Sequence, residues 1–108
     1  MDKSFKDLLT RSNALIHEVV GLDDVNVKTI SHETMEYMKK YFDLCHDIYQ
    51  YNQSKSPTTE EQVCLMDNMK KILDRYVMKK YEVAWKLLSS NYDDDFWHNM
   101  NQQFLKID

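Results

Sequence analysis

The stretch TTEEQVCLMDNMKKILDRYVMKKYEVAWKLLSS, residues 58–90, contains neither glycine nor proline. Thr58 followed by Glu61 is the signature of a helix start, and Ser56 before Pro57 is an alternative start for the same helix. The 33 residues predict one helix of about 50 Å at about 1.5 Å per residue. Its apolar side chains cover an arc of about 160°, wide enough to face two neighbouring helices, so we expect a central helix.

The rest of the chain also predicts helices. Its 108 residues include one glycine and one proline, which excludes a turn-rich sheet fold and a glycine-rich phosphate loop. Periodicity and end signals place further helices at about 4–20, 28–52 and 93–106, the second starting somewhere between Asp24 and Ser31. We therefore expect a single all-α domain over 1–108, a mostly antiparallel four-helix bundle with a long central third helix.

The length of the third helix has a consequence for assembly. Helices 4–20 and 93–106 are too short to cover the whole apolar arc of 58–90, and a second copy of the chain would cover the remainder most simply. The sequence thus favours a homodimer. A bend near Met78 to Lys80 would remove that need.

Several functional classes are disfavoured by composition. No apolar run approaches the roughly 18 residues of a membrane span, and the charged start MDKSFKDLL does not resemble a signal peptide. Two cysteines without a CxxC motif favour reduced thiols, so we expect a cytoplasmic protein. Cys64 has no evident histidine partner, and we expect neither an enzyme nor a cofactor.

Two Asp-x-x-His pairs are the candidate metal ligands. Asp43 with His46, and Asp95 with His98, stand three residues apart, a spacing that places both members of a pair on one helix face. Helical-bundle metal sites direct such pairs into the core, but both pairs fall on predicted polar faces, while Cys45 points to the core. Solvated helix surfaces are therefore favoured over a metal site.

A candidate protein-binding surface extends the apolar arc of residues 58–90. Met78, Tyr81 and Trp85 lie beside that arc, and such residue types are enriched at interfaces. The alternative is that the short fourth helix packs over them. Lys80 falls inside the apolar arc, from where its ammonium group must reach solvent or an acidic partner group.

The remaining face of the same helix is basic. Residues 70–86 hold six basic side chains against two acidic ones, although the whole chain carries a net charge of −4. Lys71, Arg75, Lys79 and Lys86 share this face, which Glu82 interrupts. It fits a solvated surface, a protein or self-association surface, or a surface that follows nucleic-acid phosphates.

The leading hypothesis is a small non-enzymatic interaction protein, a regulator, adaptor or inhibitor that binds another protein through helical surfaces. The first alternative is a nucleic-acid-associated protein that uses the basic face. A metal-dependent helical-bundle enzyme is the less favoured alternative.

Overall fold

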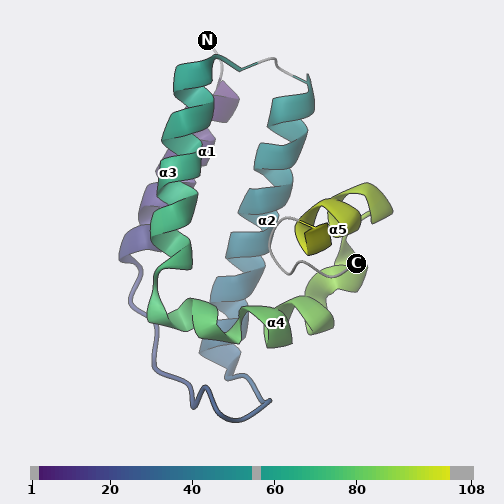
Figure 1. Cartoon of the computed structure of the whole chain (residues 1–108). Helices are drawn as coiled ribbons and strands as arrows, with labels where there is room; N and C mark the ends of the chain where they lie inside the picture. The colour runs from purple at the N-terminus through teal and green to yellow at the C-terminus, as the bar shows by residue number, and fades with distance from the viewer. Residues whose placement is uncertain (1–2, 55–56, 103–108) are drawn as a thin grey trace.

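The computed structural model describes residues 3–54 and 57–102, and this part of the chain is all-α, as predicted. α1, α2 and α3 lie lengthwise beside one another, α4 crosses one end of them, and α5 lies against the side of α2 (Figure 1). The elements are α1 Lys3–His17, α2 His32–Ser54, α3 Thr59–Leu73, the 3-10 turn η1 Tyr76–Lys80, α4 Tyr81–Leu88, the 3-10 turn η2 Ser89–Asn91 and α5 Asp94–Met100.

Local caps explain where three of these helices begin. The Thr58 hydroxyl accepts the Glu61 N–H at 3.1 Å while the Glu61 carboxylate accepts the Thr58 N–H at 3.0 Å, which confirms the expected capping box. The Ser31 hydroxyl accepts the Thr34 N–H ahead of α2, and Asp93 accepts the Phe96 N–H ahead of α5. Ser56 and residues 103–106 lie outside the described residues.

The central helix is α2, which is also the longest, whereas the sequence predicted this role for 58–90. α2 supplies side chains that are fully removed from solvent and lies between α1 on one side and α4 on the other. The side chains of α2 with no exposed surface are Thr34, Tyr37, Met38, Tyr41, Phe42 and Leu44.

The expected continuous helix over 58–90 is wrong. α3 ends at Leu73, and Arg75 takes an extended conformation with φ −73° and ψ 149°, a few residues before the bend that the sequence allowed. The buried residues of α3 pack on α1, which ends at His17. A straight continuation of α3 would therefore extend past the end of α1 and lose this packing surface. α4 instead turns across the bundle and buries Trp85 and Leu88. The break removes the reason for expecting a homodimer.

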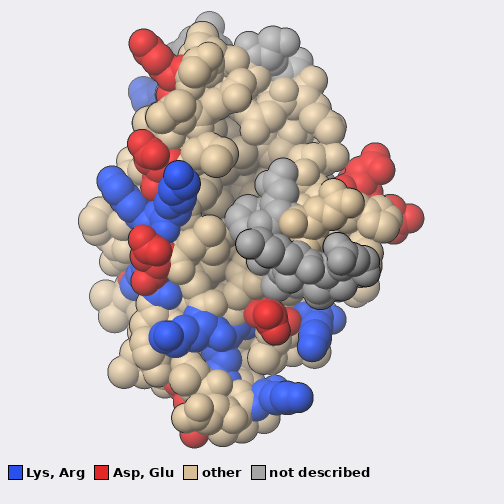
Figure 2. Space-filling model, in the orientation of Figure 1, with Lys and Arg blue, Asp and Glu red and all other residues tan. Residues whose placement is uncertain are grey.

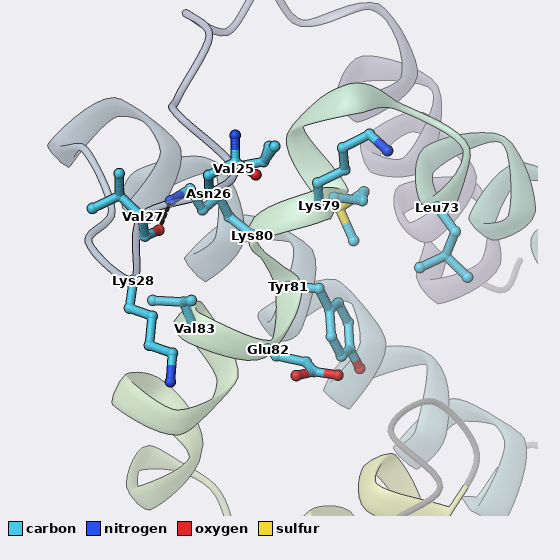
Figure 3. Close-up of a pocket in the computed structure, with 11 residues that line it drawn as sticks. Val25, Asn26, Val27, Lys28, Leu73, Lys79, Lys80, Tyr81, Glu82 and Val83 are labelled. Atoms are coloured by element: carbon cyan, nitrogen blue, oxygen red, sulfur yellow. Dashed lines mark hydrogen bonds between the residues drawn. The ribbon is translucent and has the colours of Figure 1, made fainter.

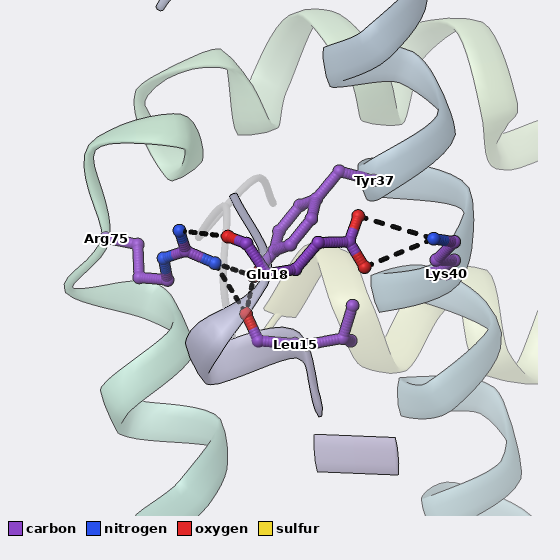
Figure 4. A network of polar contacts seen from close by, with 5 residues as sticks. All are labelled: Leu15, Glu18, Tyr37, Lys40 and Arg75. Carbon is purple, nitrogen blue, oxygen red and sulfur yellow. Dashed lines mark hydrogen bonds and ion pairs between the residues drawn. The ribbon is translucent and has the colours of Figure 1, made fainter. Parts of the chain in front are cut away.

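Arg75 connects three helices at this break (Figure 4). Its guanidinium donates to the backbone carbonyl of Leu15 at 2.6 Å and to that of Glu18 at 2.5 Å, and also to the Tyr37 hydroxyl at 3.2 Å. Helix C-termini have unpaired carbonyls and a partial negative charge, which a cation stabilises. Beside it, the Glu18 carboxylate pairs with Lys40 at 3.1 Å. Arg75 is therefore the C-terminal cap of α1.

A second polar contact joins α1 and α3 inside their apolar interface. The buried side-chain amide of Asn68 donates to the Ser12 hydroxyl at 2.8 Å and to the Asn13 side chain at 3.1 Å. Ser12 in turn donates to the Leu9 carbonyl. Because a shift of either helix would leave these buried groups unpaired, the contact holds α1 and α3 in one register.

Replacing Arg75 with alanine should lower the free energy of unfolding by about 2 to 3 kcal/mol, because two carbonyls at the end of α1 lose a charged donor. Chemical denaturation followed by circular dichroism measures this. Lys71→Ala, a change at an exposed position of α3, is the matched control and should be nearly neutral. Equal stability of the two variants would contradict a capping role for Arg75.

Candidate functional site

The connector between α1 and α2, residues 18–31, is held by polar contacts along its length. The Gly21 N–H donates to the Glu33 carboxylate at 2.6 Å, and the Ser31 N–H donates to Asp23 at 2.9 Å. The Asp24 carboxylate accepts the Asn26 N–H at 3.0 Å and closes a turn. A Cβ at Gly21 would lie 3.0 Å from the Glu33 carboxylate, so a larger residue there would require a small shift of the Glu33 side chain. The connector thus has a defined shape without being helical.

Lys80 attaches this connector to η1. Its side chain is 2 % exposed, and its ammonium group donates to the Thr29 carbonyl at 2.6 Å and to the Val27 carbonyl. A buried ammonium is costly unless its hydrogen bonds are made, and these acceptors offset that cost. The Ser31 N–H lowers the pKa of Asp23 below its ordinary 3.8, and the Lys80 charge contributes to the shift. The side chain therefore reaches connector backbone, where the sequence predicted solvent or a partner's acidic group.

A groove of about 680 Å³ opens between the connector and the η1–α4 segment (Figure 3). We call it the connector groove. Val25 and Val27 remain 37 % and 43 % exposed on the connector side. Val25, Val27, Leu73, Met78 and Val83 give the groove an apolar part, and its other lining residues are Tyr81 and five polar or charged residues. A surface hollow that combines apolar side chains with a few polar groups is a common form of binding site.

Charged side chains surround the connector groove. Lys28 from the connector, Lys79 and Lys80 from η1 and Glu82 from α4 all line it. Lys28, Lys79 and Glu82 are exposed, whereas the Lys80 charge is buried. Figure 2 shows lysine and arginine gathered over this end of the molecule, around the ends of α3 and α4. The lining of the groove thus combines apolar side chains with an excess of basic over acidic ones.

The predicted protein-binding residues Met78, Tyr81 and Trp85 belong to the chain's own core. Each is less than a tenth exposed. The Tyr81 ring lies 5.3 Å and the Trp85 ring 5.0 Å from that of Phe42, and Phe96 of α5 covers Trp85 at 6.0 Å. This arrangement corrects the prediction in favour of its alternative, that the last helix packs over Trp85. Met78 and Tyr81 retain a part in the lining of the connector groove.

The predicted basic face is divided by the break at Arg75. Arg75 itself caps α1 and is not a free surface cation. Lys71, Lys79 and Lys86 are exposed but stand on α3, η1 and α4 respectively, so they no longer follow one helix face. Lys79 places its ammonium group 5.8 Å from the centre of the Tyr76 ring.

The four candidate metal ligands do not converge. Asp43 accepts a hydrogen bond from the Tyr92 hydroxyl at 2.7 Å, and the carboxylates that pair with His46 are those of Asp47 and Asp93, at 3.8 and 3.6 Å. Within residues 3–54 and 57–102, no three histidine, cysteine or acidic side chains are grouped to hold an ion. The less favoured alternative, a metal site that joins the pair in α2 to Asp95 and His98, is therefore not formed.

His46 has a packing role in place of a metal site. Its ring lies 5.0 Å from that of Phe96 and 5.6 Å from that of Tyr92, between α2 and the start of α5. Both ring contacts help to dock α5 on α2.

The two thiols are both free, and one of them is chemically inert. Burial raises the pKa of Cys45 to about 12, so the thiol stays protonated near neutral pH. This agrees with its expected place in the core. Cys64 is half-buried on α3.

The connector groove was not predicted from the sequence, in which the connector has the character of a simple link between helices. One signal is the alternation of Val25 and Val27 with polar residues, because apolar side chains in a short polar connector indicate packing or binding. Lys80 in an apolar arc is a second signal. Lys80 donates to backbone carbonyls, and because every residue has one, the sequence does not show which carbonyls accept.

No family model, curated protein or solved structure matches this chain. Among the described helices, none combines the length and the apolar composition needed to cross a membrane.

The Asp23 contact should make the fold sensitive to acid. A carboxylate whose pKa is lower in the folded chain stabilises the fold above its unfolded pKa, and the stabilisation is lost as pH falls through the folded pKa, here below 3.8. Asp23→Asn should therefore be less stable than the parent chain at pH 7 and equally stable near full protonation. Thermal melts of the two chains across this pH range measure the difference in their stability. A difference that did not change with pH would contradict a stabilising role for the Asp23 carboxylate.

Lys80→Met should loosen the connector selectively. The Val27 and Thr29 carbonyls would lose their donor, and we expect hydrogen exchange of the Val27 amide, which bonds to the Asp24 carbonyl, to quicken about tenfold. NMR exchange measurements report this. Lys79→Met, the exposed neighbour, is the control, and matching exchange rates in both variants would show that Lys80 does not hold the connector.

Proposed function

We propose that this chain is a non-enzymatic interaction protein, a small regulator, adaptor or inhibitor, that binds another protein at the connector groove. The observation that supports this most directly is a well-anchored connector with exposed valines. Val25 and Val27 keep more than a third of their surface in solvent, although the connector is tied to α2 and η1. Exposed apolar groups held in fixed positions typically mark an interaction surface.

The anchoring of the connector favours binding energetically. A free loop loses conformational entropy when it is ordered by a partner, whereas the contacts of Lys80, Asp23 and Glu33 order this one in advance. Two further apolar side chains of the connector are exposed outside the groove lining. Val19 and Leu22, both on the connector, are 90 % and 80 % exposed. A partner covering them together with the groove would gain hydrophobic burial at small ordering cost.

The homodimer that the sequence suggested for this function depended on a long third helix, which is interrupted at Arg75. The alternative functions have less support. The nucleic-acid hypothesis depends on four side chains along one face, of which Arg75 is used as a helix cap. We place the protein in the cytoplasm, in keeping with two free thiols, one of them partly accessible.

Affinity capture from an extract of the native cells, with the partner identified by mass spectrometry, tests the proposal. Val27→Asp places a charge in the groove while retaining the backbone carbonyl that Lys80 uses, so the partner should be lost. Val63→Asp, at a 52 % exposed position of α3, is the matched control and should retain it. Identical capture by both variants would show that the groove does not bind the partner.

A further inference from the structure

We infer that the connector groove binds a short peptide segment in which an aliphatic side chain is flanked by carboxylates. The inference rests on the proposed function and names the chemistry of the partner. It follows from the charges at the groove edge, the character of its walls and its size.

The charges at the groove favour an acidic partner. Three lysines and one glutamate line it, an excess of two positive charges in a chain whose net charge is −4. The Lys80 ammonium is already bonded to the connector, which leaves Lys28 and Lys79 for a ligand. These two belong to different elements, the connector and η1, and Figure 3 shows their side chains on different sides of the groove. Carboxylates on either side of an anchor could therefore each meet one ammonium group.

The walls favour an aliphatic anchor. Val25, Val27 and Val83 contribute branched side chains to the same lining as the two lysines, and Leu73 and Met78 add further apolar groups. A volume of about 680 Å³ falls in the range of about 300 to 1,000 Å³ that ligand pockets have. A peptide that inserted one leucine-like side chain would remove exposed valine surface from water, which supplies the non-directional part of the binding energy.

Glu82 argues for a peptide over nucleic acid. Its exposed carboxylate lines the same groove as Lys28 and Lys79 and would repel any anion beside it. A phosphate backbone, charged at every nucleotide, is therefore disfavoured more than a peptide whose carboxylates lie only beside the two lysines. A peptide offers backbone N–H groups that a carboxylate can accept. Binding of single-stranded nucleic acid also depends on aromatic platforms, whereas one of the eleven lining residues, Tyr81, is aromatic.

Selection from a random peptide display library tests this chemistry directly, whatever the natural partner is. The intact chain should enrich peptides with Leu, Ile or Val flanked by Asp or Glu. An enriched peptide, labelled and measured by fluorescence polarisation, should bind about tenfold more weakly to the double variant Lys28→Glu and Lys79→Glu. Its affinity should also fall as salt is added, because the pairs are exposed.

The matched control is Lys70→Glu with Lys71→Glu, which changes the net charge equally at exposed α3 positions outside the groove. This control should bind the peptide like the parent chain, and circular dichroism melts establish that both double variants are folded. Selection on the groove variant should move to peptides rich in Lys or Arg. Equal loss in both double variants would reveal a general charge effect and overturn the inference.

Two further outcomes would overturn it. Enrichment of basic peptides, or no enrichment at all, would exclude the acidic ligand. Binding of a labelled single-stranded oligonucleotide in place of the peptide, abolished by the Lys28 and Lys79 changes, would assign the groove to nucleic acid. If either of these results were obtained but Val27→Asp still abolished capture of the natural partner, the proposed function would stand. Only the inferred peptide chemistry of the ligand would then be wrong.

Discussion

The contact of Arg75 with the end of α1 is the constraint on which the rest of the structure depends. Its guanidinium bonds to the carbonyls of Leu15 and Glu18 and to the Tyr37 hydroxyl, so the end of α3 meets α1 and α2 at one point. To reach them Arg75 must leave the helical conformation. The chain then turns through η1, and α4 crosses one end of α1, α2 and α3.

Lys80 is the second consequence of that turn. η1 brings its side chain under the connector, where the Val27 and Thr29 carbonyls accept from the ammonium group. A buried charge with such acceptors adds little net stability but strongly disfavours other arrangements, because displacement would leave it unpaired. Lys80 therefore joins the two sides of the connector groove.

The candidate site was partly visible in the sequence and partly hidden. Lys80 stood out in an apolar arc, but its acceptors are backbone atoms that any residue would provide. Met78, Tyr81 and Trp85 were recognised as apolar surface beyond the main arc, and here they form core. Aromatic side chains suit a core and an interface equally well, so only the position of α5 over Trp85 decides between them. The pairing of His46 with Asp93, and not with Asp95, likewise depends on how α5 docks.

By itself the sequence determined the all-α class and the starts of α3 and α5, because helix periodicity and caps such as Thr58 with Glu61 act within a few residues. The tertiary structure alone decided that residues 58–90 form two helices and that the connector borders a groove. No glycine or proline marks the break at Arg75. A helix without a local stop signal ends where other contacts stabilise the chain more than further helical hydrogen bonds would. Here those contacts are the hydrogen bonds from Arg75 to the carbonyls at the end of α1, together with the burial of α4.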